Sequence, residues 1–474
     1  MAVLSCSDPI LTNTSKTAAR MTNKDKAVMR DINVAKFGGT SMANYDTMRK
    51  CAEVVCQNAQ TRVVVVSACA GVTNMLVEFG AGSISITEQL ALAAKIDVIT
   101  QDIVKQLADS SKVSEQVVSI MAELRAYATG VMKYSLAEQD DILSVGERLS
   151  STVFAQVVKE SGMPSYWFDI REVMMTDSGH SQAKPQLAEI RNLAQQHLLP
   201  LTGEYIVVSQ GFIGRDAQGH TTTLGRGGSD YTAALIAEAM QAATCEIWTD
   251  VKGVYTTDPR IVSAAKPIPE LSFEEAAEMA NFGAKVLHPA TMIPAIRSGV
   301  RVFVGSSFDS EAGGTWLVQD CTEEPYFRAI SLRRHQVLVT FKSKELFSRS
   351  TYLSEVFGLF GELDWKLDLV TISETSIAIS VDTGAWATHG GYISSKLQQL
   401  VHIEVSDGYG LVTIVGNKMH SGPGVMDTIF AGMQDIPLRM VCYGANPHNI
   451  SLLVESQYGD AAVVSLHQHL FEKD

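Results

Sequence analysis

The fold is indicated by a short apolar run that ends in two glycines, INVAKFGGTS, at residues Ile32–Ser41. Its β-branched and apolar residues predict a strand, and the glycines predict a tight turn after it. Lys36 stands two residues before that turn, and because an isolated buried ammonium is costly, its side chain must reach water or meet an anion. Glycines let backbone N–H groups approach a ligand, so the run is either a phosphate-binding turn or a surface lysine beside an ordinary turn.

Four similar runs follow, separated by long helical stretches. They predict strands at Arg62–Ser67, Tyr205–Gln210, Cys245–Thr249 and Val300–Gly305, while residues 87–161 have mostly helical periodicity. This alternation predicts an α/β fold with a mostly parallel sheet flanked by helices. In such sheets ligands collect at the carboxyl ends of the strands, where turns rich in Gly, Thr and Ser lie in this chain.

The pattern changes after Gly313-Gly314, and we expect a domain boundary near residues 310–325. Two passes with a similar order of strands and helices follow at a spacing of about 60 to 70 residues, which predicts a duplicated small α+β module. The first pass predicts a strand, a helix and two strands at Ala329–Phe341, Ser354–Phe360, Leu367–Ile372 and Thr375–Val381. The second predicts a strand, a helix, two strands and a helix at Leu411–Gly416, Gly424–Gly432, Leu438–Tyr443, Asn449–Val454 and Ala461–Leu470.

Composition excludes several classes of protein. With 38 Lys and Arg against 52 Asp and Glu, the net charge of −14 disfavours binding to nucleic acid or anionic lipid. The seven cysteines form no CxxC pair, which is typical of reduced thiols. Because no apolar run approaches the ~18 residues that span a membrane and no signal-type block begins the chain, we predict a cytoplasmic protein. Residues 1–31 are expected to be a flexible leader.

A second motif, TTTLGRGGSDYTAA at Thr221–Ala234, combines glycines, an arginine and a helix start. Arg226 can clamp an anion in a bidentate way, and the N-terminus of the helix that follows favours negative charge. The alternative is a flexible hairpin whose Ser229 and Asp230 only cap that helix.

Three further motifs carry polar groups that can bind ligands. WTDVKGVYTTDPR at Trp248–Arg260 offers hydrogen bonds and aromatic stacking to a nucleotide, although Asp, Gly and Pro also form turns. SVGER places Glu147 in the first turn of a predicted helix, where a favourable helix-dipole interaction is the alternative explanation. FGAKVLHP contains Lys285, which is either a phosphate partner or an exposed lysine.

Signatures of other sites are absent. The chain has neither GxxxxGK[ST] nor GxGxxG, and no HExxH or spaced carboxylate set that predicts a protein-held metal. Any divalent ion is therefore expected to arrive with a nucleotide.

Taken together, KFGGTS, TTLGRGGSDYTAA, WTDVKGVYTTDPR and FGAKVLHPAT resemble, in order and spacing, the aspartate kinases of the amino-acid-kinase family. SVGERLS and the tail MVCYGANPHNISLLV are most similar to the monofunctional lysine-sensitive type. The resemblance implies transfer of the γ-phosphate of ATP, with Mg²⁺ bound to the nucleotide, to the β-carboxylate of L-aspartate. The product would be 4-phospho-L-aspartate, in the first step of lysine, threonine and methionine biosynthesis.

The resemblance also implies a domain plan. An amino-acid-kinase catalytic domain at 32–315 is followed by a regulatory region at 316–474 made of two ACT-like, ferredoxin-type modules. The first module, at about 343–405, is inserted into the second, at about 325–342 plus 406–474.

Roles for individual residues follow from the resemblance only. Lys36 would neutralise charge on the transferred phosphoryl group, Glu147 would pair with the α-ammonium of aspartate, and Arg226 would clamp its α-carboxylate. The catalytic set is Lys36, Asp230 and Arg226, and the aspartate set is Thr73, Glu147, Arg226 and Ser229. The nucleotide set is Lys36, Gly38, Gly39, Thr249, Asp250, Tyr255, Arg260 and Lys285. The set for a lysine effector is Leu346, Tyr352, Leu353, Leu367, Asp368, Ser373 and Glu374, in which Asp368 and Glu374 supply negative charge.

The chain departs from the family at Arg349 and Lys366, where serines are usual. These cations would oppose a lysine effector unless both side chains point outward. A homodimer, or a tetramer linked to the effector, is the family expectation. Two other readings stay open: a different amino-acid kinase, such as a glutamate or acetylglutamate kinase, and a non-catalytic amino-acid sensor that uses its ACT-like half.

Overall fold

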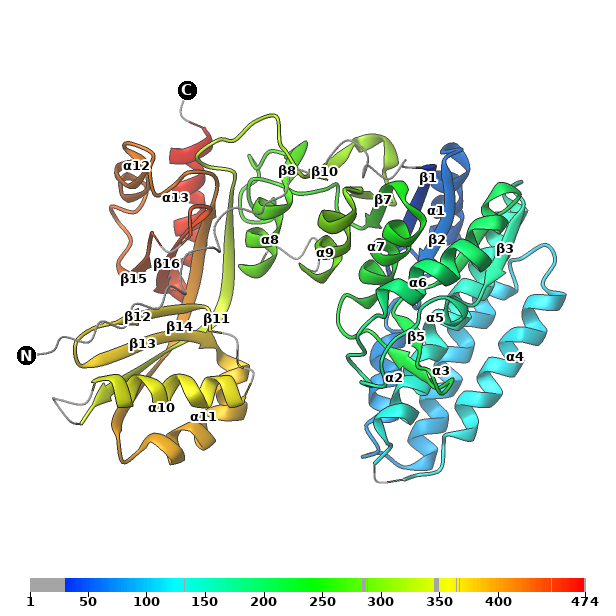
Figure 1. The fold of residues 1–474 in the computed structure, drawn as a ribbon, viewed down its shortest axis with the longest axis horizontal. Coiled ribbons are helices and arrows are strands. Elements are labelled where there is room, and N and C mark those ends of the chain that lie inside the picture. The colour runs from blue at the N-terminus through cyan, green and yellow to red at the C-terminus, as the bar shows by residue number, and fades with distance from the viewer. Residues whose placement is uncertain are drawn as a thin grey trace, which may run out of the picture.

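The computed structural model describes residues 30–472, apart from residues 132, 284–286, 288, 345–348, 364, 366 and 445. Figure 1 shows an N-terminal α/β part and a C-terminal part built on a second sheet. Most of the predicted leader lies outside the described residues. Its last two residues, Arg30 and Asp31, instead begin the first strand, β1 (Arg30–Phe37).

An eight-stranded sheet with the order β3-β4-β2-β1-β7-β9-β10-β8 forms the centre of the N-terminal part. Besides β1, its strands are β2 (Thr61–Val66), β3 (Ser165–Phe168), β4 (Ile206–Gln210), β7 (Ala242–Thr249), β8 (Glu270–Ser272), β9 (Arg301–Ser306) and β10 (Gly314–Val318). The strands from β3 to β9 pair in parallel, whereas β10 is antiparallel to β9. The five strands expected from the sequence are confirmed, and the short strands β3, β8 and β10 were not predicted.

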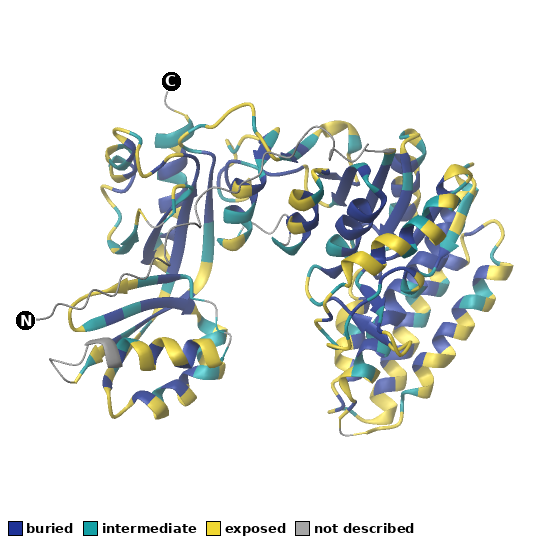
Figure 2. Cartoon of the chain, in the orientation of Figure 1, coloured by how far each residue is buried: buried dark blue, intermediate teal, exposed yellow. Residues whose placement is uncertain are grey.

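Helices cover both faces of this sheet, because its central strands bury residues on both faces. Val63 and Val65 of β2 belong to one hydrophobic core, and Val64 and Val66 belong to the other. The first core contains residues of α6 (Leu187–Leu193), α7 (Gly228–Met240), α8 (Phe273–Asn281) and α9 (Pro289–Ser298). The second contains residues of α1 (Tyr45–Gln57), α2 (Val72–Gly80), α3 (Ile86–Val104), α4 (Ser111–Ala126) and α5 (Leu136–Glu160). Figure 2 shows the sheet buried between these layers, and the helical periodicity expected over 87–161 is confirmed by α3, α4 and α5.

The C-terminal part is a six-stranded antiparallel sheet with the order β12-β13-β11-β14-β16-β15 and helices packed on it. Its elements are β11 (Ala329–Ser343), α10 (Arg349–Glu362), β12 (Leu369–Ile372), β13 (Ser376–Asp382), α11 (Thr383–Leu397), β14 (Val401–Val415), α12 (Val425–Ala431), β15 (Leu438–Cys442), β16 (Asn449–Glu455) and α13 (Gly459–Phe471). Helix α11 was not predicted, and β14 begins ten residues before the strand expected at Leu411–Gly416.

Two long strands, β11 and β14, run through the whole C-terminal sheet. The first part of β11, Ala329–Arg333, pairs only with the end of β14, whereas from Gln336 onward β11 pairs with both β13 and β14. The sheet therefore changes partners near the middle of β11, and the expected module boundaries stay a prediction.

Buried polar contacts join the two parts. Glu275 of α8 accepts hydrogen bonds from Arg328 Nε at 2.8 Å and from Asn417 Nδ2 at 2.6 Å. The buried His467 of α13 has its Nε2 atom 3.0 Å from Thr256 Oγ1, in the segment that follows β7. These contacts attach the C-terminal part to α8 and to the segment that follows β7 (Figure 1). None of the helices in the described ranges is long and apolar enough to cross a membrane.

Candidate active site

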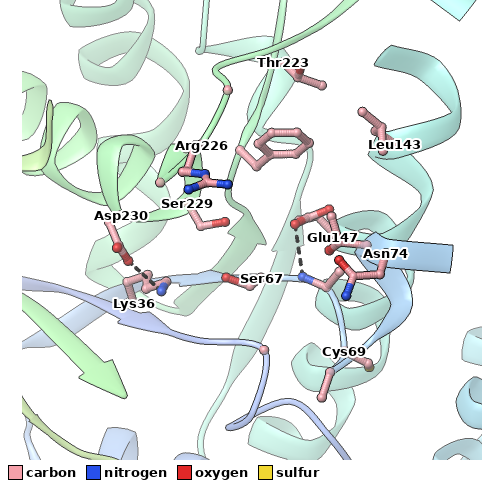
Figure 3. Close-up of a pocket in the computed structure, with 18 of the residues that line it drawn as sticks. Lys36, Ser67, Cys69, Asn74, Leu143, Glu147, Thr223, Arg226, Ser229 and Asp230 are labelled. Carbon is pink, nitrogen blue, oxygen red and sulfur yellow. Dashed lines mark hydrogen bonds and ion pairs between the residues drawn. The ribbon is translucent and has the colours of Figure 1, made fainter. Parts of the chain in front are cut away.

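A cavity of about 560 Å³ opens at the carboxyl ends of β1, β2 and β4 (Figure 3). Its walls are the turn after β1, the segment from β2 into α2, the middle of α5, and the segment from the short hairpin of β5 (Ile213–Arg215) and β6 (Thr221–Thr223) into α7. The sequence-predicted residues that line it are Lys36, Gly39, Thr73, Glu147, Arg226, Ser229 and Asp230. The structure thus brings together every residue predicted for catalysis and for aspartate binding.

One end of the cavity is suited to an anion. Lys36 Nζ lies 2.5 Å from Asp230 Oδ1, and both side chains are largely buried. Helix α7 starts there from Gly227, whose φ is +74° and which offers no side-chain cap. Helix α2 likewise starts from an uncapped Gly71. The free N–H groups of two helix N-termini therefore border the cavity, and such groups attract phosphates and carboxylates.

These geometries decide between the readings left open for the second motif. The cap of α7 is Gly227, so the explanation of Ser229 and Asp230 by capping alone is wrong. Asp230 instead pairs with Lys36, which reaches it from the neighbouring strand β1.

Glu147 lies on the opposite side of the cavity from Arg226, and Figure 3 shows the two side chains across the open space. Glu147 is 3% exposed. Its Oε1 atom accepts a hydrogen bond from the Ala68 N–H at 3.1 Å, and its Oε2 atom has no hydrogen-bond partner among the described residues. Burial raises the pKa of Glu147 to about 8, opposed by the Ala68 N–H and the charge of Lys36. A buried acceptor without a partner costs free energy, so this oxygen is placed to receive a cationic donor.

The position predicted for Glu147, the first turn of a helix, is wrong. Helix α5 begins eleven residues earlier, where Ser135 and Glu138 form a reciprocal capping box. The helix dipole therefore does not explain this carboxylate, because the dipole acts mainly within the first turn.

The arrangement fits a free α-amino acid. An ammonium can meet Glu147 Oε2, a carboxylate can meet the exposed guanidinium of Arg226, and a short side chain then points toward Lys36 and the helix N-termini. A zwitterion satisfies Glu147 and Arg226 at once, whereas an anion or a cation alone leaves one of these two side chains without a partner.

Of the residues predicted for the nucleotide, Thr249 ends β7, a strand that neighbours the glycine turn, and Asp250 follows it. The Gly38 N–H donates to the Trp248 carbonyl at 3.2 Å, so Thr249 and Asp250 follow directly beside the glycine turn. Thr249 Oγ1 donates to Asp250 Oδ1 at 3.1 Å. Except for Lys36 and Gly39, the predicted nucleotide residues that are described do not line the cavity.

Two of them lie farther along the chain. Tyr255 is half-buried, whereas the exposed Arg260 forms an ion pair with Asp258 at 2.6 Å. Lys285 lies outside the described residues, so its role stays a prediction.

Those predicted effector residues that the structure describes do not all converge within one chain. Asp368 and Ser373 flank β12, so roughly 16 Å of extended chain separates them. Asp368 forms an ion pair with Arg333, which also donates to the Asn281 carbonyl at the end of α8. Burial raises the pKa of Asp368, and the charge of Arg333 opposes this shift.

The other described residues predicted for the effector lie in α10 or just before and after β12. The Tyr352 hydroxyl is buried and donates to the Phe341 carbonyl at 2.7 Å, while Leu353 and Leu367 pack against the same core. Ser373 lies 2.7 Å from Ser376, between their Oγ atoms, and Glu374 is exposed. Leu346 and the side chains of Arg349 and Lys366 lie outside what the structure describes.

Several lining residues were not singled out from the sequence. They are Ser67, Cys69, Asn74, Ser181, Phe212 and Thr223. Phe212 lies in a glycine-rich turn, Thr223 stands inside the second motif at the end of β6, and Asn74 follows the predicted Thr73. Ser181 carries no local signal, since only long-range folding brings it to the cavity.

Comparison with known proteins agrees with this geometry. Residues 31–306 match the model of the amino acid kinase family, and residues 412–470 match that of an ACT domain. The chain belongs to the amino acid kinase family. The family predicted from the motifs, and the fold class of an amino-acid-kinase sheet followed by ACT-type α+β structure, are thereby confirmed.

One curated relative and two solved structures illustrate the likeness. Lysine-sensitive aspartokinase 3 of Escherichia coli K12 is 43% identical over 455 residues, which cover 94% of this chain and 100% of that protein. A solved structure of E. coli aspartokinase III in complex with aspartate and ADP, described as the R-state, has a TM-score of 0.81 at 42% identity and is covered along its whole length by 93% of this chain. Its complex with lysine and aspartate, described as the T-state, matches with the same score and coverage.

Proposed function

We propose that this protein is an aspartate kinase, which transfers the γ-phosphate of ATP to the β-carboxylate of L-aspartate and forms 4-phospho-L-aspartate. This is the first step toward lysine, threonine and methionine, and L-lysine inhibits it. The observation that carries the proposal is the single cavity in which the unpartnered Glu147 Oε2 and Arg226 face a lysine and two uncapped helix N-termini. The aspartokinase relative with aspartate and ADP, and its complex with lysine, support it.

The chemistry needs little beyond positioning and charge. The β-carboxylate of aspartate is ionised at pH 7 and is itself the nucleophile, so no strong general base is required. Lys36 forms an ion pair with Asp230 and would turn its ammonium toward the phosphoryl oxygens as negative charge develops there. Glu147 and Arg226 orient the amino acid so that its side chain meets the nucleotide.

A Mg²⁺ ion carried by ATP fits the residues present. Mg²⁺ in kinases usually takes one or two protein carboxylates together with phosphate oxygens, and Asp230 and Asp250 supply carboxylates near the glycine turn. The described residues contain no cluster of three ligating side chains that would hold a metal without the nucleotide. When bound, the ion would neutralise phosphate charge.

A homodimer, and a tetramer linked to the effector, complete the proposal. Strand β12 is an edge of the C-terminal sheet, and Ile372 at its end is 43% exposed. An unpaired edge with an apolar side chain is suited to contact with a second copy. Such a contact would also bring two copies of the β12 ends, with Asp368 and Glu374, to one interface.

The test is ATP-dependent acyl phosphate formation, trapped with hydroxylamine, with L-aspartate, L-glutamate and N-acetyl-L-glutamate as separate substrates. We expect turnover with L-aspartate only, and a decrease on addition of L-lysine but not of L-threonine. Turnover with glutamate or acetylglutamate alone would favour the other amino-acid kinases. Binding of amino acids without turnover would favour a sensor.

A further inference from the structure

A buried carboxylate outside the predicted site, Asp140, joins α5 to two other segments that contribute residues to the cavity. It lies in the first two turns of α5 and is fully buried. It accepts hydrogen bonds from the Ser181 N–H at 3.0 and 3.1 Å and from Thr223 Oγ1 at 2.6 Å, and His180 Nδ1 lies 2.9 Å from its Oδ2 atom. Ser181 and Thr223 both line the cavity, whereas Asp140 does not.

The position of Asp140 on α5 ties it to Glu147. The two residues are seven apart, which is nearly two helical turns, so they share one face of the helix about 10 Å apart along its axis. Asp140 therefore fixes the helix that carries Glu147 against whatever it binds.

The residues that bind Asp140 lie close to Arg226, on the opposite side of the cavity. Thr223 ends β6, three residues before Arg226. A Cβ atom added to Gly225 would lie 3.2 Å from the Ser181 carbonyl oxygen. The turn that contains Arg226 therefore packs closely against the backbone of Ser181. Ser181 itself has a φ of +69°, a conformation that serine rarely adopts without support.

We infer that Asp140 is a positioning residue that sets the separation of Glu147 and Arg226, and through it the affinity for the amino-acid substrate. The inference rests on the proposed function. Asp140 on α5 accepts hydrogen bonds from Ser181 and from Thr223 at the end of β6. These bonds hold in place the two segments whose Glu147 and Arg226 would bind the ammonium and the carboxylate of aspartate. Lys36 and Gly39, which would meet the phosphate, are not among these contacts.

A substitution of Asp140 can distinguish a positioning role from a purely structural one. Loss of a positioning residue should affect the KM for L-aspartate more than kcat or the KM for ATP. Asp140→Asn keeps the size of the side chain but leaves one acceptor oxygen in place of two, so at least one bond to Ser181 or Thr223 is lost. We expect the KM for L-aspartate to rise at least about 10-fold, with kcat within about 3-fold and the KM for ATP within about 2-fold of the wild type.

The neighbouring Asp141 provides the matched control. It lies on the same helix, and its Oδ2 atom accepts a hydrogen bond from Tyr127 at 3.1 Å, away from the cavity. Asp141→Asn should leave both KM values unchanged. His180→Ala, which removes one contact and keeps those of Ser181 and Thr223, should raise the KM for aspartate by a smaller factor.

The outcomes separate the two proposals. If the wild type does not phosphorylate aspartate, the proposed function fails. If it does, and folded Asp140→Asn keeps the aspartate KM or raises both KM values equally, the positioning role is overturned. Should Asp140→Asn not fold, His180→Ala decides, since an unchanged aspartate KM contradicts the inference and a selective rise supports it.

Discussion

Replacing Glu147 with glutamine should make the ligand-free protein more stable at alkaline pH and should lower its affinity for aspartate. The carboxylate is buried, and one of its oxygens has no hydrogen-bond partner among the described residues. Glu147→Gln keeps the shape and the acceptor for the Ala68 N–H but has no charge to bury. The gain in stability should therefore depend on pH.

The magnitude follows from the pKa of Glu147, which burial raises from 4.5 to about 8. The folded chain keeps this proton up to about pH 8, whereas the unfolded chain releases it near pH 4.5. Between these values the unfolded state binds fewer protons, so the stability of the wild type falls as pH rises, by ~1.36 kcal/mol per pH unit. The whole interval amounts to ~5 kcal/mol, of which about 3 kcal/mol falls between pH 5.5 and 8.5.

The assay is urea unfolding of both proteins without ligand at pH 5.5, 7.0 and 8.5, followed by fluorescence of the tryptophans. The free energy of unfolding of the variant minus that of the wild type should grow with pH. Glu123→Gln, at an exposed position on α4, leaves Glu147 in place and should show the pH dependence of the wild type. A difference that stays constant over this range would refute the reasoning.

Further substitutions test the other groups. Lys36→Ala should lower kcat by about 10²- to 10³-fold, because charge on the phosphoryl group loses its partner, with little change in the KM for aspartate; unchanged turnover in a steady-state assay would contradict this. Arg226→Ala should raise the KM for aspartate on the order of 10²-fold by removing a charge-assisted pair, and an effect confined to ATP would contradict its role. Gly253→Ala should lower stability by about 1–3 kcal/mol, because the φ of Gly253 is +100° and the new Cβ would lie 2.7 Å from Thr315 Oγ1; an unchanged melting temperature would argue against this strain. Asp368→Ala should raise the L-lysine concentration for half-inhibition at least about 10-fold, since a cationic effector loses its counter-charge, and an unchanged value would remove Asp368 from the effector site.

Much of the catalytic sheet could be predicted because its signals are local. Short β-branched runs that end in glycine turns predict parallel strands, and parallel strands bring their carboxyl ends to one edge. Lys36, Arg226 and Asp230 meet there although nearly two hundred residues separate the first from the others. The length of α5 could also have been predicted, since Ser135 and Glu138 have the spacing of a capping box.

The rest depends on contacts between distant segments. Ser181 and Asp140 lie far apart in sequence, and nothing around either residue indicates that one will bind the other. The cap at Gly227 was missed because Ser229 and Asp230 are themselves good capping residues, and only the left-handed backbone of Gly227 decides between them. Strand β3 has four residues, and β8 has three, which is too short for a periodic pattern.

The central claim is that one cavity holds an amino acid between Glu147 and Arg226 while a nucleotide phosphate meets Lys36. A crystal structure with L-aspartate and a non-hydrolysable ATP analogue measures this directly. We predict the α-ammonium within hydrogen-bond distance of Glu147 Oε2, the α-carboxylate on Arg226, and the terminal phosphate beside Lys36 and Gly39. Aspartate bound elsewhere, or a phosphate out of reach of Lys36, would contradict the account.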